Sequence, residues 1–330
     1  MTDRQGLIDA FLQKQGWDPA RRGRLAGDAS FRRYDRLAEN DRRAVLMDAP
    51  PPQEDVRPFI AMAEHLLGLG YSAPAILGRD VADGLLLLED LGDDTFTRLL
   101  GQGVDEESLY ALAIDLLADL HNRGATAIPA GLPAYDDERL LTEALLLTDW
   151  YLPEMLGEPL PTPEREAYIA LWRELFPVAR QVPETLVLRD FHVDNLMRLD
   201  RPGLAACGLL DFQDAVAGPL TYDLMSLLED ARRDIDPGLI ARMRTRYLAA
   251  TGLDAEAFDA SWAVLAAQRH AKVIGIFTRL CRRDGKPLYL GHIPRLWRLL
   301  ERAAATPGLE SLRNWIDRVI PPDRRGVPTP

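Results

Sequence analysis

Short alternating runs of hydrophobic and polar residues fill the first 92 positions of the chain. Runs of this kind, bounded by glycine, proline and acidic residues, are typical of half-buried strands. They predict strands at residues 24–27, 31–34, 44–47, 75–77 and 85–89. Apolar residues spaced three or four apart predict helices at residues 4–15 and 56–69. We therefore expect a small, sheet-rich N-lobe over residues 1–92.

Longer helical periods follow residue 92. The run from Leu109 to Asn122 carries one apolar stripe, and similar patterns predict helices at residues 221–230, 237–250, 255–279 and 292–305. Three short apolar segments interrupt this pattern, at residues 186–188, 195–199 and 208–212. Turn-forming residues from Asp200 to Gly203 separate the last two segments and predict a β-hairpin. The chain is thus expected to be α+β, with a mainly helical C-lobe over residues 93–330 that ends in a loose tail over residues 321–330.

Composition narrows the class of protein. Hydrophobic residues make up 47% of the 330 residues and charged residues 27%, which is typical of a globular chain. The net charge of −12 disfavours nucleic acid and anionic membrane surfaces as partners, and no pattern indicates a protein partner. Cys207 and Cys281 lack metal-ligand spacing, so neither a zinc site nor a disulfide framework is expected. Without a secretory signal or a long apolar run, the chain is predicted to be a soluble cytoplasmic protein with no membrane insertion.

The predicted hairpin carries the residues that point to chemistry. Phosphoryl transfer needs a carboxylate to accept the acceptor's proton and a cation to bridge the phosphates. Asp190 lies in the turn after an apolar strand, Asn195 opens the first arm of the hairpin, and Asp211 closes the second arm. Because the arms of a hairpin are antiparallel, Asn195 and Asp211 should end close together. Their oxygens would suit a hard cation such as Mg²⁺.

Each of these residues has a plainer interpretation when it is taken singly. A loop aspartate is more often a helix cap, and an asparagine at a strand edge is more often a turn former. The ordered set of Asp190, His192, Asn195 and Asp211, however, resembles the aminoglycoside phosphotransferase family in order and spacing. The resemblance extends over nearly the whole chain. It implies a protein-kinase-like two-lobed fold, ATP as phosphate donor, Asp190 as catalytic base, and Asn195 and Asp211 as ligands of Mg²⁺.

Two positions depart from the kinase pattern. Leu188 stands where many relatives carry histidine, and Met47 stands where protein kinases place a phosphate-binding lysine. No lysine occurs between Lys14 and Lys272, so arginine must supply any charge that the N-lobe offers to phosphate. Strand alternation allows only one of two neighbouring arginines to point inward. The candidate nucleotide-binding residues are Gly27, Asp28, Ser30, Arg32, Arg33 and Glu89, with Glu64 either orienting an arginine or acting as a surface charge.

Several stretches narrow the resemblance further. They resemble the bacterial anomeric kinases of N-acetylmuramate and N-acetylglucosamine. In that subgroup, methionine occupies the third-strand position of an otherwise kinase-like site. The stretches are residues 25–34, 46–51, 148–152, 189–197 and 268–277. The resemblance implies transfer of the ATP γ-phosphate to the C1 hydroxyl of an amino sugar, a reaction of peptidoglycan recycling.

Sugar recognition usually combines polar groups with an aromatic platform. The candidate substrate residues are Glu143, Asp149, Trp150, Tyr151, His192, Asp194, Arg269 and Lys272. Residues such as Trp150 and Tyr151 are more often core residues than site residues, and Arg269 and Lys272 are at least as well explained as a solvated helix face. Two alternatives stay open: a kinase of another small alcohol, such as an aminoglycoside, choline or homoserine, and a non-catalytic ATP-binding protein of the same fold.

Overall fold

The computed structural model describes residues 4–27 and 31–329, which form two compact units. Unit 1 contains Met1–Leu116 and Val193–Ala215, and unit 2 contains Leu117–His192 and Val216–Pro330. These two units are defined by which residues pack together. The predicted boundary at residue 92 instead separates a nucleotide-binding lobe from an acceptor-binding lobe. The functional division therefore stays a prediction.

Unit 1 is built on an antiparallel sheet of order β1-β2-β3-β5-β4. Its strands are β1 (Arg22–Gly27), β2 (Arg33–Glu39), β3 (Arg42–Asp48), β4 (Ile76–Asp80) and β5 (Leu85–Leu88). The five predicted strands are thus confirmed, although β2 runs five residues beyond the predicted end at residue 34. Asn40, with a φ of 54°, makes the left-handed turn into β3. The sheet-rich part of the fold could therefore be predicted from short apolar runs.

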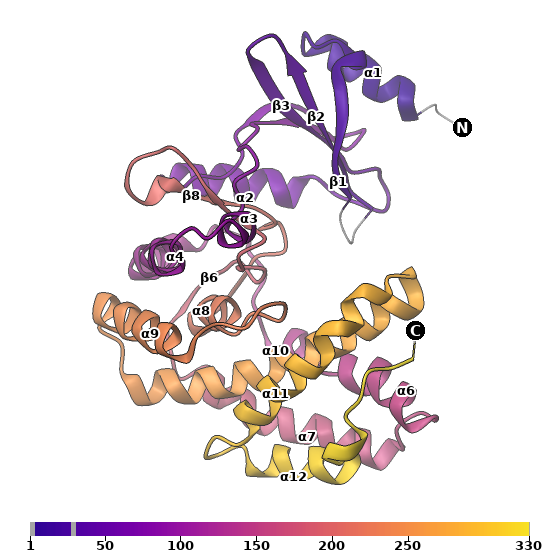
Figure 1. Ribbon diagram of the computed structural model, residues 1–330, viewed down its shortest axis with the longest axis vertical. Coiled ribbons are helices and arrows are strands. Elements are labelled where there is room, and N and C mark those ends of the chain that lie inside the picture. The colour runs from indigo at the N-terminus through magenta and orange to yellow at the C-terminus, as the bar shows by residue number, and fades with distance from the viewer. Residues whose placement is uncertain (1–3, 28–30, 330) are drawn as a thin grey trace. The chain divides into compact units, whose positions relative to one another are not determined.

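Helices cover this sheet and complete unit 1. Helix α1 (Arg4–Lys14) lies beside β1 to β3 in Figure 1 and packs Ile8, Phe11 and Leu12 against the sheet residues Leu37, Leu46 and Leu87. The other helices are α2 (Arg57–Gly68), α3 (Phe96–Gly101) and α4 (Glu106–Asn122), the last of which continues into unit 2, and a 3₁₀ turn at Pro19–Arg21. Burial of this apolar cluster holds α1 on the sheet, since each buried aliphatic or aromatic side chain contributes about 1.5–3 kcal/mol.

The predicted β-hairpin is confirmed and belongs to unit 1. Its arms are β7 (Leu196–Arg198) and β8 (Cys207–Leu209), which pair antiparallel with Leu196 opposite Leu209. A 3₁₀ turn at Gly203–Ala206 closes it. Cys207 is buried in β8, and neither it nor Cys281 forms a disulfide.

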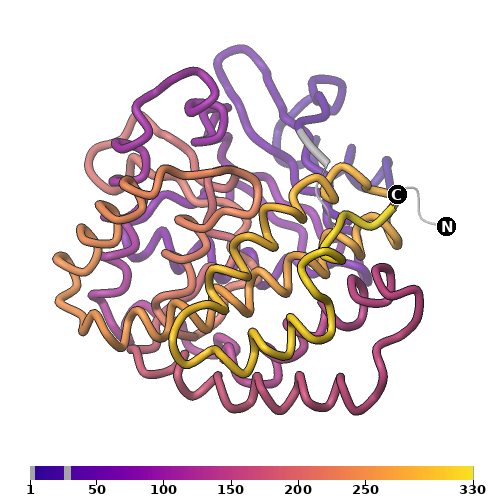
Figure 2. The backbone as a smooth tube through the Cα atoms, turned by 60° about the horizontal axis from the view of Figure 1, so that its bottom comes forward, coloured from indigo at the N-terminus to yellow at the C-terminus, as the bar shows by residue number. Residues whose placement is uncertain are grey.

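Unit 2 is mainly helical. Its helices are α5 (Asp137–Ala144), α6 (Leu152–Leu156), α7 (Thr162–Ala179), α8 (Thr221–Leu228), α9 (Pro237–Thr251), α10 (Ala255–Asp284), α11 (Ile293–Ala304) and α12 (Glu310–Val319). Helix α10 packs against α5, α7, α8 and α11, and in Figures 1 and 2 the yellow α11 lies alongside it. Gly275 of α10 permits one close approach, because a Cβ there would lie 2.2 Å from the backbone of Leu146. The helix α10 is the central element of this unit.

Several elements of unit 2 did not stand out in the sequence. Strand β9 (Val216–Pro219) pairs with β6 (Glu184–Val187). It was not predicted, because it contains glycine and proline, which are uncommon inside strands. Residues Leu147–Tyr151 form a π-helical turn, and short 3₁₀ turns lie at Gly124–Ala127, Pro287–His292 and Pro322–Arg324. Within the described residues, no helix combines the length and apolar character that a bilayer-spanning segment needs.

The prediction of a loose C-terminal tail is wrong. Arg325 donates from Nε to the carbonyl oxygen of Ile320 at 2.9 Å and lies 5.1 Å above the ring of Trp297. Its guanidinium also pairs with Glu301 at 2.5 Å and with Asp317. One buried arginine thus holds a segment whose prolines resemble those of a flexible end.

Candidate active site

In unit 1, the open end of the hairpin places Asn195 next to Asp211. The N–H of Leu210 donates to the carbonyl oxygen of Asn195 at 3.0 Å, which continues the strand pairing by one step. Asp211 follows Leu210 and has a φ of 58°, in the left-handed region that costs a non-glycine residue on the order of 1–2 kcal/mol. The backbone therefore turns sharply where the second arm ends.

The Asp211 carboxylate lies among polar groups. Its Oδ1 accepts a hydrogen bond from Gln213 Nε2 at 2.8 Å and lies 3.4 Å from Arg32 Nη2. Within residues 4–27 and 31–329, the buried Oε1 of Gln213 has no hydrogen-bond partner. Carboxylate and amide oxygens form a donor set that fits Mg²⁺, which needs only one or two protein carboxylates. The same described ranges contain no group of three histidine, cysteine, aspartate or glutamate residues that could hold a metal ion.

The two candidate arginines, Arg32 just before β2 and Arg33 at its first residue, differ in exposure to solvent. The side chain of Arg32 is only 10% exposed and lies between Glu54, at 3.9 Å, and Asp211. Arg33 is exposed. Glu54, which the sequence did not single out, also accepts the N–H of Phe31 at 3.0 Å and so holds the segment that carries Arg32. The structure therefore distinguishes the two arginines: Arg32 lies just before β2 and is mostly buried, whereas Arg33 is the exposed first residue of that strand.

The other candidate nucleotide-binding residues are Gly27, Asp28, Ser30 and Glu89. Asp28 and Ser30 lie outside the described residues, and Gly27 ends β1. Glu89 follows β5, where Arg201 of the hairpin loop pairs with it at 2.5 Å. Glu64 pairs with Arg79 at 3.0 Å on the surface rather than with an arginine before β2, which favours its interpretation as a surface charge.

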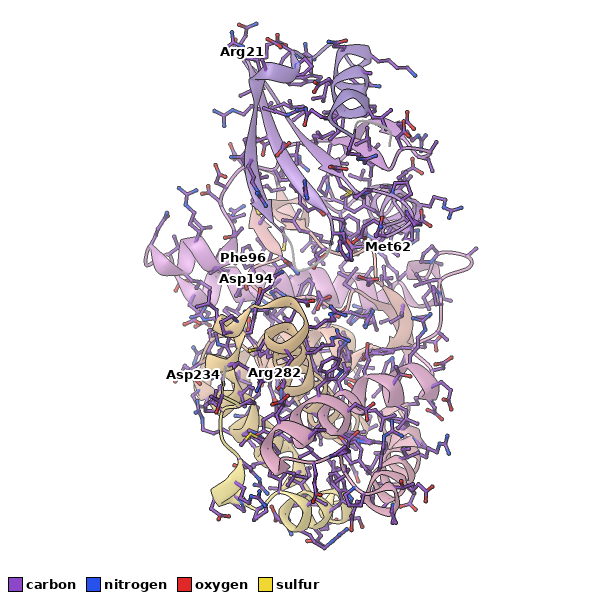
Figure 3. The ribbon with its side chains drawn as sticks, turned by 90° about the vertical axis from the view of Figure 1, so that its right-hand side faces the viewer. Arg21, Met62, Phe96, Asp194, Asp234 and Arg282 are labelled. Carbon is purple, nitrogen blue, oxygen red and sulfur yellow. The ribbon has the colours of Figure 1, made fainter. Side chains whose placement is uncertain are left out.

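Two further predicted positions lie in unit 1. Met47 is buried in β3, opposite Tyr34 on one side and Leu86 on the other. Asp194 accepts a hydrogen bond from the hydroxyl of Thr97, next to Phe96, and Figure 3 shows Phe96 and Asp194 side by side. The N–H of Thr97 also donates to Val193 O at 3.2 Å, so the start of α3 holds the segment that leads to Asn195.

In unit 2, a buried carboxylate fixes the backbone that leads to Asp190. Asp223 of α8 accepts the N–H groups of Leu188 at 2.6 Å and of Arg189 at 2.9 Å. Arg189 has a φ of 68°, so these bonds hold a left-handed residue in place. Burial raises the pKa of Asp223 to about 7, although both backbone donors lower it. Asp223 was not singled out as a site residue, although residues 218–224 resemble the start of the helix that follows the metal-binding loop in the aminoglycoside phosphotransferase family.

Glu143 of α5 is the centre of a second buried network in unit 2. Its Oε1 lies 2.9 Å from Lys272 Nζ and also accepts from the Arg189 guanidinium. Its Oε2 accepts from the Tyr135 hydroxyl and from Gln268 Nε2 at 3.3 Å. Burial alone would raise the pKa of Glu143, but Lys272 and Arg189 lower it to about 2. The network thus contains two of the predicted substrate residues, Glu143 and Lys272.

The remaining predicted substrate residues of unit 2 have other surroundings. Asp149 pairs with Arg165 at 3.0 Å, and Trp150 is half-buried. Tyr151 is fully buried, accepts from Trp297 Nε1 at 2.9 Å and donates to Gly326 O at 2.8 Å. His192 lies 3.4 Å from Arg232 Nη1, measured from Nε2. Arg269 is buried, and its Nη1 has no hydrogen-bond partner among the residues that the structure describes.

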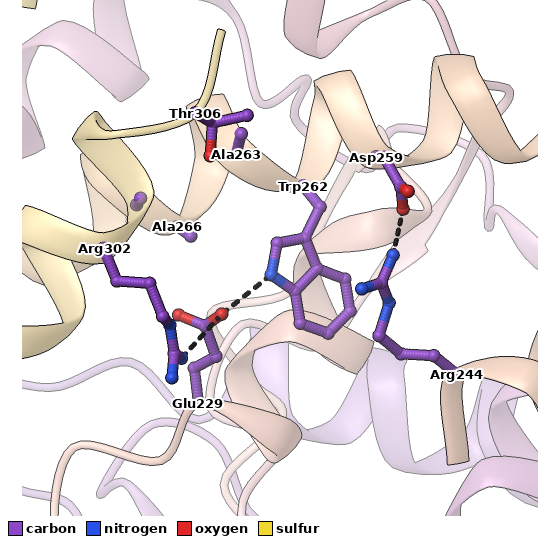
Figure 4. Close-up of a pocket in the computed structure, with 9 residues that line it drawn as sticks. Glu229, Arg244, Asp259, Trp262, Ala263, Ala266, Arg302 and Thr306 are labelled. Atoms are coloured by element: carbon purple, nitrogen blue, oxygen red, sulfur yellow. Dashed lines mark hydrogen bonds and ion pairs between the residues drawn. The ribbon is translucent and has the colours of Figure 1, made fainter. Parts of the chain in front are cut away.

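A hollow of about 240 Å³ elsewhere in unit 2 carries a third polar cluster, drawn in Figure 4. The buried Glu229 accepts from Trp262 Nε1 at 2.9 Å and pairs with Arg302 at 3.1 Å, and His270 Nε2 lies 2.7 Å from its other oxygen. Arg244 pairs with Asp259 at the same hollow. No residue of this cluster was predicted, because its members are spread over four helical segments.

Comparison with known proteins identifies the family. The profile described as the phosphotransferase enzyme family matches residues 23–259 of the chain, which is more than half of its length. The chain belongs to this family. The predicted resemblance to the phosphotransferase family is confirmed, and the protein is an enzyme, a phosphotransferase with an alcohol group as acceptor.

Relatives of this phosphotransferase carry a common name. A protein of Caulobacter vibrioides, called N-acetylmuramate/N-acetylglucosamine kinase, is 36% identical, and the match covers 98% of this chain and 99% of the relative. A protein of Pseudomonas aeruginosa with the same name is 42% identical, with 88% of this chain and 87% of the relative covered.

Solved structures confirm the protein-kinase-like fold of this phosphotransferase. The choline kinase LicA from Streptococcus pneumoniae superposes with a TM-score of 0.64 at 12% identity, covering 92% of this chain and 99% of that chain. The gentamicin complex of APH(2")-IIa superposes with a TM-score of 0.60 at 16% identity, covering 91% and 99%. At these identities the likeness concerns the fold alone.

Proposed function

We propose that this phosphotransferase moves the γ-phosphate of ATP to the C1 hydroxyl of N-acetylmuramate or N-acetylglucosamine, in peptidoglycan recycling. The observation that carries the proposal is the match to the Caulobacter vibrioides kinase of that name over 98% of the chain. The motif from Asp190 to Asn195, with Asp211 just after the second arm of the hairpin, supports phosphoryl transfer as the chemistry.

Asp190 is the proposed catalytic base. It takes the proton of the C1 hydroxyl while the sugar oxygen bonds to the γ-phosphorus and the bond between that phosphorus and the bridging oxygen of ADP breaks. An anomeric hydroxyl is more acidic than an ordinary alcohol, so one positioned carboxylate suffices. Asn195 and Asp211 would hold Mg²⁺, which supplies positive charge to the phosphates when it is bound.

The nucleotide would be held by residues of unit 1. Arg32 is the proposed phosphate contact, because its guanidinium faces Asp211 whereas Arg33 is exposed. Gly27, Asp28, Ser30 and Glu89 are the other proposed nucleotide-binding residues. A solved relative of the same fold is described as ADP-bound, which is consistent with an adenine nucleotide.

The proposed sugar contacts are the polar and aromatic residues Asp149, Trp150, His192, Asp194, Arg269 and Lys272. Tyr151 is left out of this set because the side chain is fully buried between Trp297 and the C-terminal segment. The unpartnered Nη1 of Arg269 offers a donor for a sugar oxygen or carboxylate.

The test is a transfer assay with Mg-ATP and a panel of acceptors. The panel contains N-acetylmuramate, N-acetylglucosamine, gentamicin, choline and homoserine, and phosphorus NMR locates the new phosphate. We expect a C1 phosphate on one or both amino sugars. Transfer to gentamicin, choline or homoserine alone would overturn the amino-sugar proposal. ATP that raises Tm without any transfer would indicate a non-catalytic nucleotide-binding protein.

A further inference from the structure

We propose that Arg269 binds the lactyl carboxylate of N-acetylmuramate and so sets how strongly the enzyme prefers this sugar to N-acetylglucosamine. The inference rests on the proposed function and deepens it, because the two proposed acceptors differ in charge. N-acetylmuramate carries a lactyl ether that ends in a carboxylate, whereas N-acetylglucosamine has a neutral hydroxyl at the same carbon. Only the first acceptor therefore offers an anion to a cationic side chain.

The guanidinium of Arg269 is buried without a carboxylate of its own. Arg269 lies on α10 and is only 4% exposed, and its Nη1 has no hydrogen-bond partner among the described residues. Across residues 4–27 and 31–329, no carboxylate forms an ion pair with this side chain either. A buried charge is costly unless it is paired, so an anionic ligand would complete what the protein leaves open.

The other cation on this face of α10 is already paired. Lys272 follows Arg269 by three positions, and residues at that spacing share a helix face. The Nζ of Lys272 lies 2.9 Å from Glu143 Oε1 and 3.4 Å from the Tyr222 hydroxyl. Of these two cations, Lys272 has its carboxylate within the described structure and Arg269 does not. Arg269 is thus the better candidate to receive a carboxylate from the substrate.

Arg269 also lies near the backbone that leads to Asp190, and both residues belong to unit 2. The Asp223 carboxylate accepts the N–H groups of Leu188 and Arg189, the two residues before Asp190. Burial raises the pKa of Asp223, and the positive charge of Arg269 is among the influences that lower it, so the guanidinium acts on the same carboxylate. A sugar with its C1 hydroxyl at Asp190 would extend its lactyl group toward this part of α10.

A guanidinium suits a carboxylate particularly well. Its planar fork donates two parallel hydrogen bonds to the two carboxylate oxygens, which an ammonium group cannot do. A charge-assisted pair of this kind contributes about 10- to 100-fold in affinity. N-acetylglucosamine would leave the Arg269 guanidinium without an anion, so we expect the wild type to have a lower KM for N-acetylmuramate.

The test removes the protein's charge and the substrate's charge in turn. The acceptors are N-acetylmuramate, its uncharged lactyl amide and N-acetylglucosamine. In Arg269→Met, kcat/KM for N-acetylmuramate should fall about 10- to 100-fold, mainly through KM, whereas kcat/KM for the two neutral acceptors should change less than about 3-fold. In the wild type, the amide should be poorer than the acid by a similar factor. A merely structural role of Arg269 would lower kcat/KM for all three acceptors alike.

The matched control is an arginine at the other extreme of exposure on the same helix. Arg283 lies in the last turn of α10, is exposed, and pairs with the adjacent Asp284 at 2.8 Å. Arg283→Met should leave kcat/KM for each acceptor within about 2-fold of the wild type. If Arg269→Met does not fold, Arg269→Lys takes its place, because it keeps the charge but loses the planar fork and should weaken N-acetylmuramate alone. The comparison of the acid with its amide on the wild type needs no variant.

The outcomes separate this inference from the proposed function. Equal losses for the three acceptors would make Arg269 structural and overturn the inference, while the amino-sugar kinase activity would stand. A wild type that uses the acid and the amide equally well would overturn the inference in the same way, as would transfer to N-acetylglucosamine without transfer to N-acetylmuramate. Absence of transfer to either amino sugar would refute the proposed function and the inference together.

Discussion

Arg32 Nη2 lies 3.4 Å from Asp211 Oδ1, so the arginine before β2 and the carboxylate at the end of the hairpin are paired within unit 1. The pair joins residues 179 positions apart in the sequence. In the proposed function, Asp211 would hold Mg²⁺ and Arg32 would contact the nucleotide's phosphates, the role that lysine has in protein kinases.

Arg32→Met should raise KM for ATP about tenfold, which corresponds to the loss of one charge-assisted hydrogen bond. The control is Arg33→Met, which removes an exposed arginine from the next position and should change KM for ATP less than about 2-fold. Steady-state kinetics with varied Mg-ATP measure both. Equal effects of the two variants would contradict the assignment of Arg32.

Asp190→Asn should reduce kcat by about 10²- to 10⁴-fold, the range expected when a general base is removed. The fold and nucleotide binding should persist, and both are checked by the shift of Tm that ATP produces. Asp200→Asn, at an exposed position of the hairpin turn, is the control and should keep its activity. A variant at position 190 that fails to fold would show instead that Asp190 is structural.

The raised pKa of Asp223 predicts an unusual dependence of stability on pH. Its pKa of about 7 means that the folded protein keeps this proton at pH values where the unfolded chain has lost it. The contribution of Asp223 to the free energy of unfolding therefore falls as pH rises from about 4 to 7, by up to about 1.4 kcal/mol per pH unit. Asp223→Asn should lack this slope. Urea unfolding of both proteins at pH 5 and pH 7 measures the difference, and identical slopes would exclude a raised pKa.

The lowered pKa of Glu229 predicts the opposite dependence of stability on pH. Burial would raise its pKa, but His270, Arg302 and Trp262 lower it to about 2, so the stability it contributes is lost as pH falls from about 4.5 to 2. Glu229→Gln should cost about 1.5–3 kcal/mol at pH 7, because the buried side chains of Trp262 and His270 lose a charged hydrogen-bond partner. Asp259→Asn breaks the more exposed pair with Arg244 at the same hollow and should cost less than about 1 kcal/mol. Comparable costs for the two variants, measured by urea unfolding, would contradict this account.

Much of the fold could be predicted because local patterns specify it. The apolar runs of β3 and β5 and the stripes of α2 and α10 identify their elements without knowledge of what they pack against. Strand β9 depends on β6 for its hydrogen bonds, and the C-terminal segment depends on the ion pairs of Arg325, so neither leaves a local signal. Contacts between distant segments are what single-sequence patterns miss.

The residues of the candidate site also differ in how well the sequence could predict them. Asp190, Asn195 and Asp211 lie in one short motif and hairpin, and their spacing is visible in the sequence. Glu54 and Asp223 act through backbone N–H groups of segments 23 to 35 positions away, so their own neighbourhoods do not show these contacts. Glu143 stands out in sequence as a polar residue near aromatics, whereas its four donors come from three other places in the chain.

The buried Met47 has a consequence for how this enzyme can be detected. Acyl phosphates of ATP label kinases by acylating a lysine amine beside the nucleotide, and a thioether cannot form that amide. The sequence contains three lysines, Lys14, Lys272 and Lys286, and none of them lies on the sheet strands of unit 1. Because these strands carry no lysine to acylate, we expect such reagents to label the enzyme weakly, whereas capture on an immobilised nucleotide would detect it.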